Sequence, residues 1–365
     1  MRDISKHQVR PDVADAERPQ LEALLADRGF EAFRARQLFQ WIHRKGVIDP
    51  GQMTNLPAGL RQCIGEQFVL SRPAVAARER SSDGTEKFLL ALGSGHQIEA
   101  VYIPDTPAMT FCISTQVGCA MACAFCLTGK MGLVRHLRAG EIAGQVGVLA
   151  DAVGLRGTAF NLVLMGMGEP LHNYDETMKA LRILTDAEGL AIPSRRITLS
   201  TVGLLPALER LAREPIMPNL AISLHAPTDA LRSRLVPVNT KYAIADIIEA
   251  CARFPLRRRH RITFEYVLLA GVNDSVADAR ALARLVAPVR CKVNLIPLNA
   301  AAGIPFERPS DAAIDLFART LSERGVGTSV RKSRGRDIRA ACGQLMVDEG
   351  RHSPGQLLAG VAFPE

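Results

Sequence analysis

Three cysteines stand within eight residues of one another, in the segment STQVGCAMACAFCLTGKMG. Their order is Cys119–x3–Cys123–x2–Cys126, which supplies three thiolates from one short loop. Thiolates hold iron–sulfur clusters, and a [4Fe–4S] cluster usually takes four of them. With only three, one iron keeps an open coordination position. The spacing therefore predicts a [4Fe–4S] cluster that can bind a small molecule at its fourth iron.

An open iron of this kind can chelate the amino and carboxylate groups of S-adenosylmethionine (SAM) and pass it one electron. The sulfonium then cleaves to a 5′-deoxyadenosyl radical, which can abstract hydrogen from an unactivated carbon. A zinc site and buried structural thiols are the two other interpretations. Structural zinc normally takes a fourth Cys or His at close spacing, and His136 stands ten residues on, next to basic residues. Phe125, directly before the last cysteine, suits the dry wall of a cluster site.

Five further cysteines stand outside this loop. A disulfide scaffold is not expected, because the chain is long and the spacings are uneven. A free cysteine is usually a small buried hydrophobe, and we expect this of Cys63, Cys251 and Cys291. Cys112 lies in the strand that feeds the cysteine loop, and it has the same default interpretation. Cys342 precedes a glycine after a run of basic residues, so it could reach a pocket near the strand ends.

Polar residues end several strand-like segments after the cysteine loop. FNLVLMG runs into MGMGEPLHN, where Gly166, Gly168 and Glu169 predict a turn that a ligand can approach closely. Glu169 could accept a hydrogen bond from the amino group of a methionine moiety. Others stand where ribose and adenine need hydrogen bonds, namely Ser200 in RRITLST, Ser223, Leu224 and His225 in NLAISLH, and Asn299 after CKVNLIPL. For any one of them alone, a strand-end cap or turn is an equally good interpretation.

The elements that carry these residues alternate between strand and helix from about residue 109 to 335. The expected strands are MTFCIST, FNLVLMG, RRITLST, NLAISLH, RITFEYVLL, CKVNLIPL and GTSVRKS. Helix-like segments separate them, which indicates βα units and a parallel sheet. Six or so units predict an α/β fold that is a partial (β/α)6 barrel. In such folds the active site lies at the carboxyl ends of the strands, where the motifs above fall.

Three other segments flank this core of residues 109–345. Residues 1–75 predict a small helical accessory domain, and residues 76–108 a short antiparallel β extension. Residues 346–365 are expected to be a loosely ordered tail. Basic residues run along the helical domain, which indicates either a solvated face or a surface that contacts RNA; they are Arg34, Arg36, His43, Arg44 and Lys45.

The net charge of the 365-residue chain is +8, with a pI near 9.3. Such a surplus is typical of proteins with an anionic partner, above all nucleic acid, although many basic proteins bind nothing anionic. The first residues have no apolar stretch and no cleavage site of a signal peptide. No segment has the apolar length needed to span a bilayer. We therefore expect a cytoplasmic protein with no membrane partner.

With these motifs in order, the chain resembles the bacterial dual-specificity 23S ribosomal RNA and transfer RNA adenine-carbon-2 methyltransferases, a radical SAM family. The resemblance covers most of the chain outside the leader and the tail. It runs through FQWIHRKG, RSSDGTEKF, VYIP, QVGCAMACAFC, GMGEPLHN, LSTVG, AISLHAP, VPVN, EYVLLAGVND, NLIPLN and VRKSRGRDIRAACGQL.

This resemblance implies a role for three residues outside the cluster. Carbon-2 of adenine is not nucleophilic, so a direct methyl transfer from the sulfonium fails. One SAM is implied to methylate Cys342, and a second to supply the radical that takes a hydrogen from this methyl group. The carbon radical adds to adenine, Glu99 removes the adenine proton, and Cys112 attacks the sulfur of Cys342 to release the product. A glutamate between apolar residues can have a raised pKa, although without the resemblance Glu99 is an outward-facing strand residue.

The chain departs from the family at Arg336 and Arg339, where acidic residues are common. Two alternatives remain open at this point. A sister family methylates carbon-8 of the same ribosomal adenosine, and a non-catalytic RNA-binding protein with an iron–sulfur cluster needs neither Cys112, Cys342 nor Glu99. The implied partners are 23S rRNA, tRNA and an electron donor such as flavodoxin. Nothing in the sequence demands more than a monomer.

Overall fold

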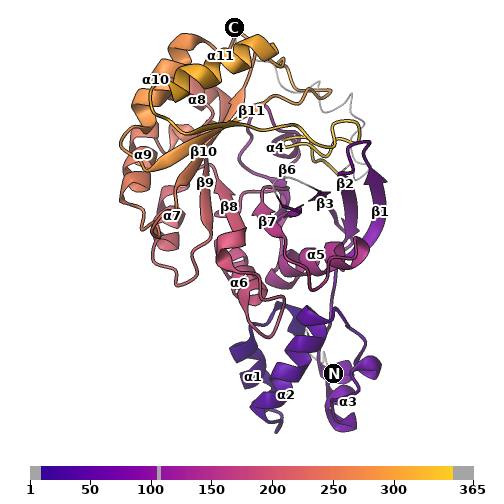
Figure 1. The fold of residues 1–365 in the computed structure, drawn as a ribbon. Coiled ribbons are helices and arrows are strands. Elements are labelled where there is room, and N and C mark those ends of the chain that lie inside the picture. Colours follow the sequence, from indigo (N-terminus) through magenta and orange to yellow (C-terminus); the bar gives the residue numbers. More distant parts are fainter. Residues whose placement is uncertain (1–9, 105–107, 348–365) are drawn as a thin grey trace, which may run out of the picture.

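The structure is a computed structural model that describes residues 10–104 and 108–347. Its main feature is an open sheet of ten strands in the order β1-β2-β3-β4-β7-β8-β9-β10-β11-β12 (Figure 1). The last seven pair in parallel, as predicted. They are β4 (Thr110–Cys112), β7 (Asn161–Leu164), β8 (Ile197–Thr201), β9 (Asn219–Ser223), β10 (Ile262–Leu268), β11 (Cys291–Pro297) and β12 (Thr328–Val330). In the described chain β1 and β12 are the two edges, so the predicted partial barrel is confirmed.

Helices join the parallel strands. They are α5 (Ala139–Ala152), α6 (Tyr174–Thr185), α7 (Leu205–Leu211), α8 (Asp229–Leu235), α9 (Ile244–Arg253), α10 (Val276–Val286) and α11 (Asp311–Ser322). α9 shows why these segments are helical, since its buried residues Ile244, Ile247, Ile248 and Cys251 recur at helical spacing. All were expected from the sequence except α8, which is short and rich in charge. Figure 1 shows α7, α9, α10 and α11 along the outer side of the strands.

The predicted antiparallel extension is also present. β1 (Ala74–Arg80), β2 (Glu86–Ala91) and β3 (Gln97–Ile103) pair antiparallel, and β3 continues antiparallel onto β4. In that last pairing Val101 stands opposite Cys112. Because side chains alternate along a strand, Glu99 lies on the same face of the sheet as Val101. The extension thus brings Glu99 to the neighbourhood of the strand that precedes the cysteine loop.

The N-terminal unit is helical, as predicted. It contains η1 (Val13–Asp15), α1 (Arg18–Ala26), α2 (Ala32–Phe39), η2 (Gln40–Arg44), η3 (Pro50–Gln52) and α3 (Ala58–Gln67). Leu21 and Leu25 of α1 and Leu60 and Ile64 of α3 are fully buried. They belong to one hydrophobic cluster that continues into the barrel. The tail expected after residue 346 lies, from residue 348, outside the described residues.

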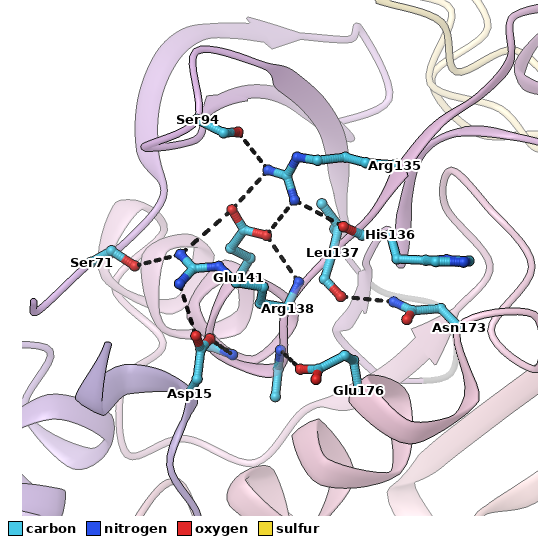
Figure 2. Close-up of polar contacts among 12 residues, drawn as sticks. Asp15, Ser71, Ser94, Arg135, His136, Leu137, Arg138, Glu141, Asn173 and Glu176 are labelled. Carbon is cyan, nitrogen blue, oxygen red and sulfur yellow. Dashed lines mark hydrogen bonds and ion pairs between the residues drawn. The ribbon is translucent and has the colours of Figure 1, made fainter. Parts of the chain in front are cut away.

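A polar network joins this unit to the barrel at the first turn of α5 (Figure 2). Asp15 accepts hydrogen bonds from Gly140 N (2.9 Å) and from Arg138 Nη1 (2.8 Å). Glu176 of α6 accepts from Ala139 N, and Glu141 accepts from Arg138 N. Free N–H groups at a helix start favour such carboxylates, which also complement the helix dipole. The network therefore fixes η1 and α6 against α5.

Candidate functional site

A cavity opens at the carboxyl ends of the parallel strands. Ten of the thirteen residues predicted for the site line it. They are Cys119, Cys123, Cys126, Gly168, Glu169, Ser200, Ser223, His225, Asn299 and Cys342. The three that do not line it are Glu99, Cys112 and Leu224. The cavity thus brings together residues from segments spread over more than half of the chain.

The cysteine loop is more structured than a plain loop. Cys119 ends β5 (Gln116–Cys119), which pairs with β6 (Gly132–His136), and Cys126 caps α4 (Leu127–Lys130). A Cβ on Gly118 (φ +74°) would lie 1.9 Å from the carbonyl oxygen of Gly132, so only glycine fits there. This hairpin and α4 were not expected from the sequence. These two short strands show no clear alternation of apolar and polar residues in the sequence. Their pairing register depends instead on the close contact at Gly118.

All three cysteines of the loop are buried or half-buried. Burial raises the pKa of Cys119 to about 12, and burial with the charge of the neighbouring thiols raises the pKa of Cys123 and Cys126. They are therefore thiols in the metal-free protein, and metal binding would displace their protons. In the described chain no group of three or more His, Cys, Asp or Glu is arranged for a single metal ion. In a cluster, by contrast, each thiolate binds a different iron.

The glycines of the GMGE turn serve the packing of the protein itself. A Cβ on Gly168 (φ +102°) would lie 2.6 Å from Cβ of Gln116, and one on Gly166 would lie 2.7 Å from the backbone of Ile113. The turn therefore lies directly against the segment that leads into the cysteine loop. Gln116 Oε1 also accepts a hydrogen bond from Glu169 N at 2.8 Å. Both glycines also line the cavity, so the close approach of a ligand to this turn stays a prediction.

The carboxylate of Glu169 is oriented by main-chain donors. Oε1 accepts from Leu171 N at 3.0 Å, and Oε2 accepts from Val202 N at 2.9 Å. Burial raises the pKa of Glu169 to about 7 despite these hydrogen bonds. The group lines the cavity. It can therefore accept a hydrogen bond or a positive charge from a ligand at neutral pH.

His225 follows β9 in the left-handed region, with φ +60°. Its Nδ1 accepts from Val267 N at 3.0 Å, so Nε2 carries the proton. Burial, and then the charge of Arg232, lowers the pKa of His225 to about 3, and the ring is neutral. The ring meets Phe125 edge-on at 4.7 Å between centroids. His225 thus offers one N–H donor, while the side chain of Leu224 lies in the hydrophobic core.

Arg232 of α8 is a site residue that the sequence did not reveal. It is fully buried, and its guanidinium donates to the carbonyl oxygens of Val202, Ser223 and Leu224 and to Oδ1 of Asn239. It therefore fixes the ends of β8 and β9 beside the cavity. From sequence alone, an arginine in a short, charged helix is expected to lie on a solvated face. No feature of the sequence therefore indicates that Arg232 is a buried site residue.

The residues of the cavity fit SAM bound to a cluster. Oδ1 of Asn299 is buried and has no hydrogen-bond partner within the described protein. A buried acceptor without a donor is costly, and an adenine amino group or a ribose hydroxyl would satisfy it. Glu169 provides an acceptor for an amino group, and His225 provides a donor. The thiols of the cysteine loop lie on the wall of the same cavity.

Cys112 and Cys342 lie close to each other although 230 residues separate them. Burial, and then the charge of Cys342, raises the pKa of Cys112 to about 12. Cys342 lines the cavity, whereas Cys112 is buried in β4. The half-buried Arg331 faces both, since a negative charge on Cys342 or Cys112 raises the pKa of its guanidinium. All eight cysteines are free thiols in the structure.

Glu99 is buried and does not face solvent, so the default interpretation of an outward-facing strand residue is wrong. Its Oε1 lies 3.1 Å from Nζ of Lys87, and its Oε2 accepts from Met346 N at 2.9 Å. Burial raises the pKa of Glu99, and Lys87 opposes this shift. Glu99 does not line the large cavity.

Comparisons with known proteins agree with this architecture. Residues 12–70 match the ribosomal RNA large subunit methyltransferase N-terminal domain, and residues 113–283 match the radical SAM superfamily. The dual-specificity RNA methyltransferase RlmN of Rhodospirillum rubrum is 47% identical over 94% of this chain and 83% of its own length. That of Geobacter sulfurreducens is 48% identical over 89% of each chain. A crystal structure of a radical SAM methyltransferase from Sphaerobacter thermophilus superposes with a TM-score of 0.87 at 46% identity, covering 92% of this chain and 99% of that one.

Proposed function

Because this chain belongs to the RlmN family of dual-specificity RNA methyltransferases, we propose that it methylates carbon-2 of two kinds of adenosine. One lies in the peptidyl transferase centre of 23S rRNA, and the other is 3′ of the anticodon in tRNAs. As a radical SAM enzyme it uses a [4Fe–4S] cluster and SAM. The observation that carries the proposal is the position of Cys342, on the wall of the same cavity as the three loop cysteines.

Cys119, Cys123 and Cys126 hold the cluster in this proposal. When bound, the cluster and SAM supply a methyl cation equivalent and a 5′-deoxyadenosyl radical. Glu169 accepts from the amino group of SAM, and its two main-chain donors orient it for that contact. Around the rest of the cofactor we place Gly168, Ser200, Ser223, His225 and Asn299, with Leu224 contributing only its main chain.

Cys342 is the methyl carrier in this proposal, because it faces the cavity. Cys112 lies behind it and attacks its sulfur once the methyl carbon is joined to adenine. Cys112 gives up its proton and a sulfur–sulfur bond forms, while the carbon–sulfur bond breaks with its electron pair on carbon, which takes up a proton. The unpaired electron from the radical addition would return to the oxidised cluster, and the methylated base leaves. The resulting Cys112–Cys342 disulfide must be reduced by an external thiol before the next turnover. The half-buried Arg331 supports the attack, since its charge favours a thiolate at either cysteine.

Glu99 is the base that removes the proton from carbon-2. It lies on the same sheet face as Val101, the residue paired with Cys112, which supports this assignment. A carboxyl with a pKa raised by burial can take a proton near neutrality. The ion pair with Lys87 opposes that shift and favours the ionised form of Glu99.

Several wider features complete the proposal. Residues 1–75 act as an RNA-contacting accessory domain, residues 76–108 as a β extension, residues 109–345 as the catalytic core and residues 346–365 as a tail. The protein works as a monomer in the cytoplasm, where its RNA substrates are, and takes electrons from a donor such as flavodoxin. In the described chain, no helix has both the length and the apolar character that a bilayer crossing requires.

Nucleoside mass spectrometry of a strain that lacks this chain tests the proposal and its carbon-8 alternative together. The proposal expects 2-methyladenosine to disappear from 23S rRNA and tRNA and to return when the chain is restored. Loss of 8-methyladenosine would instead identify the sister activity. Unchanged 2-methyladenosine would contradict the proposal.

A further inference from the structure

A second, much smaller pocket lies beside the large cavity. The two share Ile296, Asn299, Arg331 and Cys342 as lining residues, so they adjoin at the proposed methyl carrier. The smaller cavity adds Arg334 to its wall. Two arginines thus line the pocket that reaches Cys342, and the charge of Cys342 acts on one of them, Arg331.

The two arginines differ in their surroundings within the protein. The charges of Cys342 and of the buried carboxylate of Glu265 raise the pKa of Arg331. In residues 10–104 and 108–347, no side-chain hydrogen bond or ion pair forms at Arg331 or Arg334, and Nε of Arg334 is buried and unsatisfied. Arg232, by contrast, donates to four acceptors. A buried donor without an acceptor is costly. Arg334 thus has a donor free for an acceptor from outside the described chain, beside the charge of Arg331.

The segment that carries Arg334 is held in place rather than free. Gly335 N donates to Oδ2 of Asp83 at 3.0 Å, which ties the segment to the turn between β1 and β2. Gly335 has φ +61°, and a Cβ there would lie 2.6 Å from Cβ of Ala340. The side chain of Arg334 therefore starts from a fixed backbone, which lowers the entropic cost of binding.

We propose that Arg331 and Arg334 form a phosphate subsite that holds the RNA phosphodiester next to the target adenosine. The planar guanidinium matches a phosphate in a bidentate manner. An RNA backbone carries such a group at every nucleotide, and the target base must reach Cys342 at the shared wall. This inference rests on the proposed function. The carboxylate of SAM has similar chemistry and is the competing occupant.

The test compares Arg334→Gln with Arg324→Gln in the cluster-loaded full chain. Arg324 is exposed and precedes β12, whereas Arg334 follows it, so the control removes the same charge at the opposite end of one strand. The probe is an anticodon stem-loop RNA with an adenosine 3′ of the anticodon. Arg334→Gln should weaken its binding roughly tenfold and lower the salt slope of the binding constant by about 1. Arg324→Gln should change neither, and SAM affinity should stay the same in both variants.

A stem-loop with a neutral methylphosphonate beside the target adenosine sharpens this test. The methylphosphonate is placed first on one side of that adenosine and then on the other. It should weaken RNA binding to the wild type at only one of these two linkages. At that linkage it should cause no further loss of RNA affinity in Arg334→Gln. Unchanged RNA affinity and salt slope in Arg334→Gln would overturn the subsite. Weaker SAM binding with normal RNA binding would assign the arginine to the cofactor instead. Failure of the proposed function is separate, because it appears as wild-type RNA without 2-methyladenosine.

The thermal stability of the same variants separates a ligand role from a structural one. Arg334 has no side-chain acceptor in the part of the chain that the structure describes, so its replacement by glutamine should leave the melting temperature unchanged or raise it. A marked fall in melting temperature, with RNA affinity restored on cooling, would show that the side chain supports the fold and would also overturn the subsite. Arg334→Lys keeps the charge and should recover part of the RNA affinity.

Discussion

At the scale of single residues, Cys342 and Cys112 differ as a carrier and a resolving thiol should. A thiol is a poor nucleophile compared with its thiolate. Cys112 is buried and does not line the cavity, so it escapes methylation, whereas Cys342 faces the cavity. Burial also raises the pKa of Cys112 to about 12, so Cys112 must lose its proton before it attacks. Cys342→Ala should therefore abolish RNA methylation and leave cluster assembly intact. Iron content and the visible absorption of the cluster are the control, and a fully active variant would refute the carrier role.

Cys112→Ala should have a different result, because the adduct can form but cannot be resolved. We expect RNA to remain covalently attached to the protein under turnover conditions, visible as a shifted band on a denaturing gel. Cys251→Ala is a matched control, since Cys251 is also buried but lies on α9. A Cys112→Ala preparation that turns over without any crosslinked species would remove its assigned role.

Glu169 makes SAM binding depend on pH. Its pKa is about 7 in the cofactor-free protein, so it is mostly protonated at pH 6 and mostly ionised at pH 8. The amino group of SAM binds the carboxylate and not the acid, so binding releases the proton and affinity rises with pH. The carboxylate contributes roughly tenfold between pH 6 and 8. Calorimetric titrations should show this rise as a difference in SAM affinity between wild type and Glu169→Gln over that pH range. Taking this difference also cancels the titration of SAM itself. Parallel profiles of SAM affinity against pH for the two proteins would contradict the contact.

At the scale of elements, the first turn of α5 depends on a glycine. A Cβ on Gly140 would lie 2.7 Å from Oδ1 of Asp15 and 2.8 Å from the backbone of Ala14. Gly140→Ala should thus push η1 away and lower the free energy of unfolding by about 1–3 kcal/mol. Gly59→Ala in α3 is the control, because no atom lies within 4 Å of the added methyl and the helix should gain about 0.5–1 kcal/mol. Equal stabilities in chemical denaturation would refute the packing role of Gly140.

The elements also show how far the sequence alone reaches. The parallel strands and most helices follow from runs of apolar residues with strand or helix spacing, and the site residues follow because they end those strands. The β5–β6 hairpin and α8 could not be predicted, since Gly118 and Arg232 act through contacts with distant segments. The burial of Glu99 could not be predicted either, because Glu99 lies in β3 and its ion-pair partner Lys87 lies in the neighbouring strand β2. Contacts that depend on tertiary packing leave no local pattern in the sequence.

At the scale of the whole molecule, one hydrophobic cluster runs from the N-terminal helices into the barrel. The helical unit is therefore attached by packing as well as by the network around Asp15 (Figure 2). The molecule presents RNA-binding candidates on this unit and a deep cavity at the strand ends. The surplus of basic residues is consistent with a polyanionic substrate that spans both.

The central claim is that a protein cysteine, not SAM, delivers the methyl carbon to adenine. It is tested most directly by anaerobic turnover of the reconstituted enzyme with RNA and SAM bearing a fully deuterated methyl group. Mass spectrometry should then find 2-methyladenosine that keeps two of the three deuteriums, with the third in 5′-deoxyadenosine, because the radical removes one from the methyl group on Cys342. A product that keeps all three deuteriums, or RNA without 2-methyladenosine, would contradict the account.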